Sequence, residues 1–354
     1  MGQNVILYNE IDFHEVLKTF PIWLVKASEV SSVLPLKKEM FDLLIIDEAT
    51  QCDISSILPL MQRAKGVVVV GDPKQLNHVS FLSRAFQNEL LRKHGLTDLH
   101  FDSFYNFRDL SILDFVNNKI PNHDQIVFLN EHYRSNPDII GFSNQEFYSD
   151  SLTVMTDHPN RQGIVSTHFI QTNGVRNSKG INETEADEVI GKISLLISTA
   201  ERLQEPAIKT IGILSPFRDQ TDYLNDLILK KIEPELIKKY RVLCGTAYSF
   251  QGEERDVMFL SMCVDKNSHA SAYYHLNKPD VFNVSVTRAK HKQYVFLSVS
   301  AKELKSSIFK DFLTYDWKKE SAYKELGIDE EFASSVAYSL SKLKIHTKAA
   351  YPVA

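Results

Sequence analysis

Apolar residues occur along this chain in short dense runs, each followed by a polar cluster and then by a segment with helical spacing. The run at 41–46, FDLLII, is too dense for a half-exposed strand and is typical of a strand buried on both faces of a parallel sheet. The run at 66–71, GVVVVG, has the same character and is framed by glycines. Residues 53–64, between the two runs, are predicted to form a helix. Strand, helix and strand in this order indicate a parallel α/β unit.

The same alternation continues through the rest of the chain. Further strands are predicted near 21–25, 128–129, 164–170, 210–214, 242–246, 257–264 and 293–298, and helices near 27–36, 136–148, 182–202, 218–231 and 279–290. Residues 80–120 are expected to be mainly helical. We therefore predict an α/β fold with two parallel-sheet domains, 1–125 and 126–300, and a helical C-terminal extension at 301–354 without a recognisable motif.

Composition narrows the class of protein without naming its function. The chain has 354 residues, a hydrophobic fraction of 43% and a formal net charge of −5, so a basic surface for nucleic acid would have to be local. Its three cysteines, Cys52, Cys244 and Cys263, form no CxxC pair, which fits a reducing compartment. No apolar stretch reaches membrane-spanning length and the polar start is no signal peptide. We expect a cytoplasmic protein with no membrane partner.

Two adjacent carboxylates, Asp47 and Glu48, follow directly after the apolar run at 41–46. Open α/β sheets bind ligands at the carboxyl ends of their strands. An aspartate there can hold Mg²⁺, and a neighbouring glutamate can orient a water for attack on a phosphate. The alternative is structural, with Asp47 capping the helix that begins near Asp53 and Glu48 stabilised by its positive end.

Several polar clusters follow predicted strands in a fixed order along the chain. They are DEATQ at 47–51, GDPKQL at 71–76, EHYRSNP at 131–137, SPFRDQ at 215–220, FQGEERD at 250–256 and NVSVTRAK at 283–290. Each is weak by itself, but their order and spacing together are specific. The set resembles superfamily 1 helicases, in the group of the nonsense-mediated-decay RNA helicase and the replication helicase-nuclease, over about residues 20 to 300. The resemblance implies two RecA-like domains with ATP hydrolysed in the cleft between them.

In the first domain the resemblance assigns four residues to the nucleotide. Asp47 would hold Mg²⁺ as the metal ligand, and Glu48 would be the general base for the attacking water. Gln51 would lie beside the nucleotide. Gln75 would sense the γ-phosphate and the water.

In the second domain the resemblance assigns two arginines and a glycine to the phosphates, and two further residues to the base and the ribose. Arg134 would contact the γ-phosphate, and Arg288 would be the second arginine finger. Tyr133 could stack on the base. Gly252 would approach phosphate, and Glu254 would meet the ribose. A catalytic or metal-binding role for the neighbouring His132 is not expected, since no second ligand has suitable spacing.

The resemblance also places single-stranded DNA or RNA across both domains. Its contacts would be made by Ser28, by Pro216 and Arg218 in the turn after one strand, and by Thr246. Small hydroxyls and backbone amides that grip phosphates would bind without regard to sequence. The structural alternative, ordinary loop residues, stays open for all four.

One expected motif is missing. The chain has no Gly-x-x-x-x-Gly-Lys-Ser/Thr, and its Gly191-Lys192 pair lies inside a predicted helix. The phosphate loop supplies the backbone amides and the lysine that hold the β- and γ-phosphates. We therefore expect weak or no binding of ATP and Mg²⁺ by this chain alone, and a missing upstream segment of the same protein that completes an incomplete first domain. The alternatives are a non-hydrolysing interaction module derived from a helicase and, more remotely, a two-metal nuclease.

Overall fold

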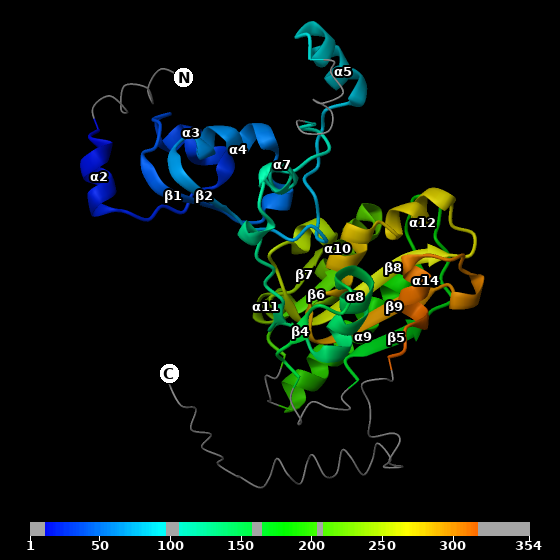
Figure 1. The fold of residues 1–354 in the computed structure, drawn as a ribbon. Coiled ribbons are helices and arrows are strands. Elements are labelled where there is room, and N and C mark those ends of the chain that lie inside the picture. The colour runs from blue at the N-terminus through cyan, green and yellow to red at the C-terminus, as the bar shows by residue number, and fades with distance from the viewer. Residues whose placement is uncertain (1–10, 97–105, 158–164, 204–207, 318–354) are drawn as a thin grey trace. The chain divides into compact units, whose positions relative to one another are not determined.

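The computed structural model describes residues 11–96, 106–157, 165–203 and 208–317 (Figure 1). The chain divides into two compact units. The first is Met1–Leu129 with Pro279–Val284, and the second is Asn130–Lys278 with Ser285–Ala354. Each unit is built around a parallel sheet, as the alternation of apolar runs and helical segments predicts.

The sheet of the first unit has two strands, β1 (Phe41–Ile46) and β2 (Ala64–Val69), which pair in parallel. Helix α4 (Ile54–Met61) connects them and begins at Asp53, whose Oδ1 accepts a hydrogen bond from the Ser56 amide (2.9 Å). Strand, helix and strand therefore fall where the sequence predicts them. One part of the expectation is wrong: β1 is not buried on both faces.

The two faces of this sheet differ sharply. On one face Ile46 packs with Ile57 and Leu60 of α4 in the core of the unit. On the other, Leu43 and Ile45 are 53% and 63% exposed, and Val68 and Val70 beside them are 45% and 40% exposed. An apolar run shows that a segment forms a strand, but whether both faces are covered depends on elements elsewhere in the protein.

The remaining elements of the first unit are short. They are α2 (Phe13–Thr19), η1 (Ala27–Glu29), α3 (Val30–Val33), η2 (Ala49–Gln51), α5 (Arg84–Lys93), α7 (Ile112–Lys119) and η3 (His123–Gln125). The strand expected at 21–25 is absent, and Ile22 and Leu24 there are 83% and 97% exposed. The helix expected at 27–36 is shorter and begins as a 3-10 turn.

The second unit contains a five-stranded, wholly parallel sheet with the order β5-β9-β8-β6-β7. Its strands are β5 (Thr167–Gln171), β6 (Ile211–Leu214), β7 (Leu243–Gly245), β8 (Arg255–Asp265) and β9 (Ala289–Ser298). Each lies at or within a few residues of a predicted strand. The strand expected at 128–129 is absent, and the pair β3 (Glu131–His132) and β4 (Thr153–Val154) begins just after it.

Helices cover both faces of this sheet. On one face α9 (Glu183–Leu203) and α10 (Arg218–Lys231) bury an apolar core against β6, β8 and β9. On the other, Phe142 of α8 (Pro137–Tyr148) meets Phe312 of α14 (Ile308–Thr314), with ring centroids 5.1 Å apart, and Phe312 meets Phe169 of β5. The short helices of this unit are α11 (Pro234–Lys239), η5 (Ala247–Phe250), α12 (Ala270–Leu276) and η6 (Ala301–Glu303), whereas most of α13 (Pro279–Val286) belongs to the first unit. Most of the predicted extension at 301–354 lies outside the described residues.

A buried polar network joins the start of α9 to the carboxyl ends of β8 and β9. Glu185 is fully buried and accepts hydrogen bonds from Ser261 Oγ (2.7 Å), the Cys263 amide (2.8 Å) and Ser298 Oγ (2.8 Å). Asn182 Oδ1 caps the helix by accepting from the Glu185 amide (3.1 Å), and the Asn182 amide donates to Gln220 Oε1 (2.8 Å). Burial raises the pKa of Glu185 to about 7, although these hydrogen bonds to the carboxylate oppose the rise.

Candidate functional site

In the first unit the clusters that follow β1 and β2 lie side by side. The Val70 amide donates to the Ile46 carbonyl (2.8 Å), and the Ala49 amide donates to the Val70 carbonyl (2.9 Å). A Cβ added to Gly71 would lie only 3.2 Å from the Ala49 nitrogen. Because the two chain segments touch at this point, the acidic pair and the cluster at 71–76 share one edge of the sheet.

The acidic pair has a backbone conformation that fixes where its side chains lie. Glu48 has a φ of +50°, a left-handed conformation that is uncommon for residues other than glycine and is often found at functional sites. Asp47 Oδ1 accepts from the Glu48 amide (2.9 Å), and Gln51 Nε2 donates to the Glu48 carboxylate (3.3 Å). The alternative role for Asp47 as the cap of α4 is wrong, because Asp53 makes that contact.

The turn after β2 is held by an aspartate that the sequence motifs do not single out. Asp72 accepts from the Lys74 amide (2.9 Å) and from Gln75 Nε2 (2.9 Å), so its carboxylate orients the side chain of Gln75. This is the local hydrogen bonding that aspartate offers in turns, and the Gly-Asp-Pro sequence carries its signal. The next contact, from the His78 amide to the Thr50 carbonyl (2.9 Å), again ties the two clusters together.

The donor set at this edge fits a magnesium ion that is shared with a phosphate. Asp47 is exposed and Glu48 is half-buried, so both carboxylates remain accessible. Within the described ranges no group of three or more His, Cys, Asp or Glu residues is arranged to hold a metal ion. Mg²⁺ commonly uses only one or two protein carboxylates and completes its shell with waters and substrate phosphates. Asp47 is the side chain that would hold it here.

In the second unit two cations converge on Glu254. Arg134 Nε lies 2.8 Å from Glu254 Oε2, and Lys290 forms an ion pair with the other carboxylate oxygen. Partial burial raises the pKa of Glu254, but the hydrogen bond and charge of Lys290 and the charge of Arg134 outweigh burial and leave that pKa below its usual range. These three residues come from clusters that lie far apart in the sequence.

Arg288 and His132 lie close to this ion-pair cluster. Arg288 is 2% exposed and donates to Thr287 Oγ1 (3.1 Å). Burial, together with the positive charges of Arg134 and Arg288, lowers the pKa of His132 to about 4. The imidazole is therefore neutral near pH 7, and its Nε2 accepts a hydrogen bond from the Ser135 amide (2.9 Å). His132 thus has a structural part in holding the turn that carries Arg134.

Hydrogen bonds to backbone carbonyls attach this turn to the first residues of β9. Ser135 Oγ donates to the Ala289 carbonyl (2.7 Å), and the Asn136 amide donates to the Lys290 carbonyl (2.9 Å). The Arg255 amide at the start of β8 donates to the Arg288 carbonyl (3.0 Å). The result is a compact site, assembled from residues 131–136, 252–255 and 288–290, in which Arg134 and Lys290 pair with the Glu254 carboxylate.

Two further residues predicted to contact the nucleotide lie next to this site. Tyr133 is 65% exposed, and its hydroxyl donates to the Glu131 carboxylate, which raises the pKa of Tyr133. Gly252 has a φ of +69°, so its conformation requires glycine, although an added Cβ would meet no atom within 4 Å. The ring of Tyr133 is therefore open to a planar partner, while Gly252 shapes the turn before Glu254.

Comparison with known protein families identifies the chain. A family model described as an AAA domain matches residues 111–300, which is more than half of the chain, and a second AAA-domain model matches residues 26–81. Relatives that match this chain include the probable helicase senataxin and a regulator of nonsense transcripts from Dictyostelium discoideum. The chain belongs to the superfamily 1 helicases of this group.

Three relatives show how much of such a helicase this chain represents. An uncharacterized ATP-dependent helicase of Mycoplasma genitalium is 24% identical, over 86% of this chain and 28% of its own length. Senataxin of Homo sapiens is 24% identical over 72% of this chain and 9% of its length. The helicase SEN1 of Saccharomyces cerevisiae is 27% identical over 81% of this chain and 12% of its length. The chain therefore spans less than a third of each of these relatives.

The four residues predicted to contact nucleic acid have different environments in the structure. Ser28 is exposed in η1, and Arg218 is exposed at the start of α10. Thr246 is half-buried after β7. Pro216 is buried, so its ring is not available for contact, and its carbonyl accepts a hydrogen bond from His275 Nε2 (3.0 Å). In this turn, contact with a ligand would have to come from Arg218 and the backbone.

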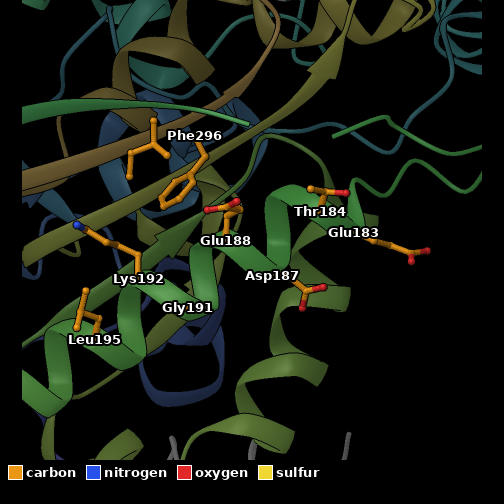
Figure 2. A pocket seen from close by; sticks show the side chains of 9 residues that line it. Glu183, Thr184, Asp187, Glu188, Gly191, Lys192, Leu195 and Phe296 are labelled. Carbon is orange, nitrogen blue, oxygen red and sulfur yellow. The ribbon is translucent and has the colours of Figure 1, made fainter. Parts of the chain in front are cut away.

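A shallow groove on the helicase's second unit contains none of these candidates. It runs along α9, and Figure 2 shows Glu188 and Lys192 on the side of that helix that faces Phe296. Lys192 Nζ lies 5.0 Å from the centroid of the Tyr294 ring. The remaining lining residues are Ile170, Glu183, Thr184, Asp187, Gly191 and Leu195.

We find no helix in the described parts of the chain with the length and apolar character needed to cross a membrane.

Proposed function

We propose that this chain is part of the motor of an ATP-dependent helicase or translocase that acts on single-stranded nucleic acid. In this proposal the first unit supplies the acidic half of the catalytic machinery, with Asp47 on Mg²⁺ and Glu48 as general base. The second unit supplies the cationic half, with Arg134 and Arg288 on the phosphates. Bound MgATP contributes the γ-phosphoryl group that is transferred to water. Two sets of residues that act on one nucleotide link hydrolysis to domain movement, which is what translocation requires.

The observation that carries the proposal is the meeting of the two clusters in the first unit. Asp47, Glu48 and Gln75 lie at adjoining strand ends, and Gln51 and Asp72 orient the side chains of Glu48 and Gln75. Phosphoryl transfer depends mainly on positioning and on neutralising charge, so a pre-oriented carboxylate and amide are the parts that the reaction needs.

The second unit supports the same proposal. Arg134, Arg288, Glu254 and Lys290 lie together, although they come from three separate clusters. An arginine finger contributes roughly three to five orders of magnitude to the rate of NTP hydrolysis. A surface ion pair with no function would not need the backbone contacts that fix residues 135 and 136 to β9.

The exposed face of β1 and β2 supports the proposal that a further segment completes the first domain. Leu43, Ile45, Val68 and Val70 form one apolar strip on a sheet with two described strands. Parallel sheets are normally covered on both faces and contain more strands. We infer that an upstream segment carrying the phosphate loop covers this strip, and that the chain alone hydrolyses ATP slowly or not at all.

The test is phosphate release from MgATP by this chain and by a version extended upstream, each with and without single-stranded DNA and RNA. We expect activity that depends on the extension and on the polymer. In the extended protein, Glu48→Gln should lower the turnover number by about a thousandfold, within the range of about 10²–10⁴ that a general base contributes. Glu89→Gln, which changes an exposed carboxylate on α5, is the matched control and should leave turnover unchanged.

The outcomes separate the possible functions. An extended Glu48→Gln protein that hydrolyses ATP as well as its parent would refute the role of Glu48. Nucleic-acid binding without hydrolysis in either protein would instead favour a non-hydrolysing module derived from a helicase.

A further inference from the structure

The loop that connects β5 to α9, residues 172–181, is held rigidly although most of it has no regular structure. The Thr172 amide donates to the Leu297 carbonyl (2.6 Å), and the Arg176 amide donates to Asp265 Oδ2 (2.5 Å). Asn177 Oδ1 accepts from the amides of Lys179 (3.0 Å) and Ile181 (3.1 Å), which closes the tip of the loop. These contacts fix the backbone that carries two cationic side chains, Arg176 and Lys179.

Arg176 has an arrangement that is unusual for a structural arginine. Its guanidinium carbon lies 3.9 Å from the centroid of the Phe217 ring, so the cation is held over the face of the ring. The guanidinium makes no hydrogen bond or ion pair to another described residue. Asp219 lies near Arg176, on the other side of Gly180. A Cβ added to Gly180 would be 3.1 Å from Arg176 Nη2 and 3.1 Å from Asp219 Oδ2. The two side chains nevertheless form no ion pair. The N–H donors of the guanidinium therefore lack an acceptor in the part of the chain that the structure describes.

Phe217, on which Arg176 stacks, lies in the turn that carries Arg218. Arg218 is 87% exposed, and its contact with Asp222 is long (3.9 Å). Lys179 at the tip of the neighbouring loop is exposed and likewise makes no ion pair within the described chain. Two loops thus bring three cations to one part of the surface of the second unit, and the most rigid of them is Arg176.

We propose that Arg176 is a nucleic-acid contact that binds a backbone phosphate of single-stranded DNA or RNA. A planar guanidinium recognises phosphate through paired hydrogen bonds, and the contact with Phe217 fixes the position of the group before the ligand arrives. The assignment rests on the proposed function and on the contact that the resemblance implies at the turn containing Arg218. It adds the loop 172–181 to that surface.

The phosphate is the part of the ligand that this arrangement recognises. Asp219 and Asp265 lie beside Arg176, and the Asp265 carboxylate is occupied by the backbone amides of Arg176 and Asn267. Phosphate contacts carry no sequence information, so Arg176 should contribute equally on DNA and RNA. Its effect should depend on salt, because each phosphate contact releases bound counterions.

The test measures binding of fluorescent oligothymidylate and oligouridylate to the 354-residue chain over a series of salt concentrations. Arg176→Ala should raise the Kd about tenfold on both polymers, near the lower limit for a charged hydrogen bond. It should also reduce the slope of log Kd against log salt by about one. Arg176→Lys keeps the charge and should preserve the salt slope while weakening binding, because lysine lacks the planar fork.

The matched control is Lys238→Ala. Lys238 is an exposed cation on α11, at the amino end of the sheet, whereas the turn at 215–218 follows the carboxyl end of β6. Its removal should change neither the Kd nor the slope by a comparable amount. Far-UV circular dichroism and melting temperature check that the Arg176 variants remain folded. If Arg176→Ala does not fold, the Kd and the salt slope of Arg176→Lys and of Lys179→Glu test the same assignment.

Three results would overturn the assignment. Equal binding and an unchanged salt slope for Arg176→Ala would refute it while leaving the proposed function intact. An equal loss in Lys238→Ala would show that only total charge matters. A wild-type chain, and an extended chain, that bind neither polymer at any salt concentration would refute both proposals together.

Discussion

Glu185 provides the most direct test of the energetics of the second unit. It is a fully buried carboxyl group whose described partners are hydroxyls, an amide side chain and a backbone amide, with no cation among them. A carboxylate without a paired cation is costly to bury, and this cost explains its raised pKa. The substitution Glu185→Gln keeps the shape of the side chain and removes the charge.

The sign and size of the effect follow from the two pKa values. In the unfolded chain Glu185 releases its proton near its ordinary value of 4.5, whereas in the folded protein it keeps the proton until about pH 7. The folded state binds more protons in this window, so Glu185 lowers the free energy of unfolding as the pH rises from about 4.5 to 7. The loss is complete above pH 7 and amounts to about 3 kcal/mol. The Glu185→Gln variant should not show this loss of stability.

The measurement is urea unfolding of both proteins at pH 5 and pH 8. The chain has two tryptophans, Trp23 and Trp317, and Trp317 packs on Phe169 and Phe312 in the second unit. In a Trp23→Phe background its fluorescence reports the unit that contains Glu185. We expect the free energy of unfolding of the Glu185→Gln variant, relative to its parent, to rise by up to about 3 kcal/mol between the two pH values.

Comparing the two proteins at two pH values cancels the contributions of other groups to the pH dependence of stability. His132 also makes stability depend on pH, because its lowered pKa costs stability as the pH falls from 6.5 towards about 4, but it does so equally in both proteins. Any loss from altered hydrogen bonding in the variant is the same at both pH values. Glu188→Gln, an exposed site on the same helix, should show no such change. A difference for Glu185→Gln that is constant or falls with pH would refute the reasoning.

Two further predictions concern single contacts in each unit. Removing the helix cap with Asp53→Ala should lower the free energy of unfolding of the first unit by about 1 kcal/mol, measured by urea unfolding followed through Trp23 in a Trp317→Phe background. Gly174→Ala should lower the free energy of unfolding by roughly 3 kcal/mol, because the added Cβ would lie 2.0 Å from Asn182 Oδ1. Gly191→Ala is the contrasting substitution: Gly191 lies in α9, an added Cβ would meet no atom within 4 Å, and the melting temperature should rise slightly.

The local pattern of the sequence predicts most of the regular elements. α10 begins and ends where helical spacing places it, and β1, β2, β8 and β9 follow dense apolar runs. The failures have a common cause. Residues 21–25 and 128–129 have strand-like composition but pair with no described strand, and Leu43 and Ile45 lack a covering layer among the described residues. A strand needs a partner, and a single run of sequence does not specify one.

The candidate sites divide in the same way. The residues of each cluster, such as Asp47 and Glu48, can be found from the sequence because they are contiguous and follow an apolar run. The pairing of Arg134 with Glu254 spans far more sequence than any local pattern, so only the folded sheet reveals it. The Gly-Asp-Pro sequence indicates that Asp72 holds a turn, but its contact with the side chain of Gln75 becomes visible only in the structure.

The ion pair between Arg134 and Glu254 bears on how the proposed reaction could begin. Both side chains are about one-third exposed, 34% and 37%, and pairs with such access to water contribute about 1 kcal/mol or less. A phosphate group, with its larger charge, can therefore compete with the carboxylate for Arg134. Lys290 also pairs with Glu254, so the half-buried carboxylate would keep a cation if Arg134 moved to a phosphate. We therefore interpret the ion pair with Glu254 as the position of Arg134 before a phosphate binds. Glu254 would be neutralised by a cation both before and after Arg134 moves from the carboxylate to the phosphate.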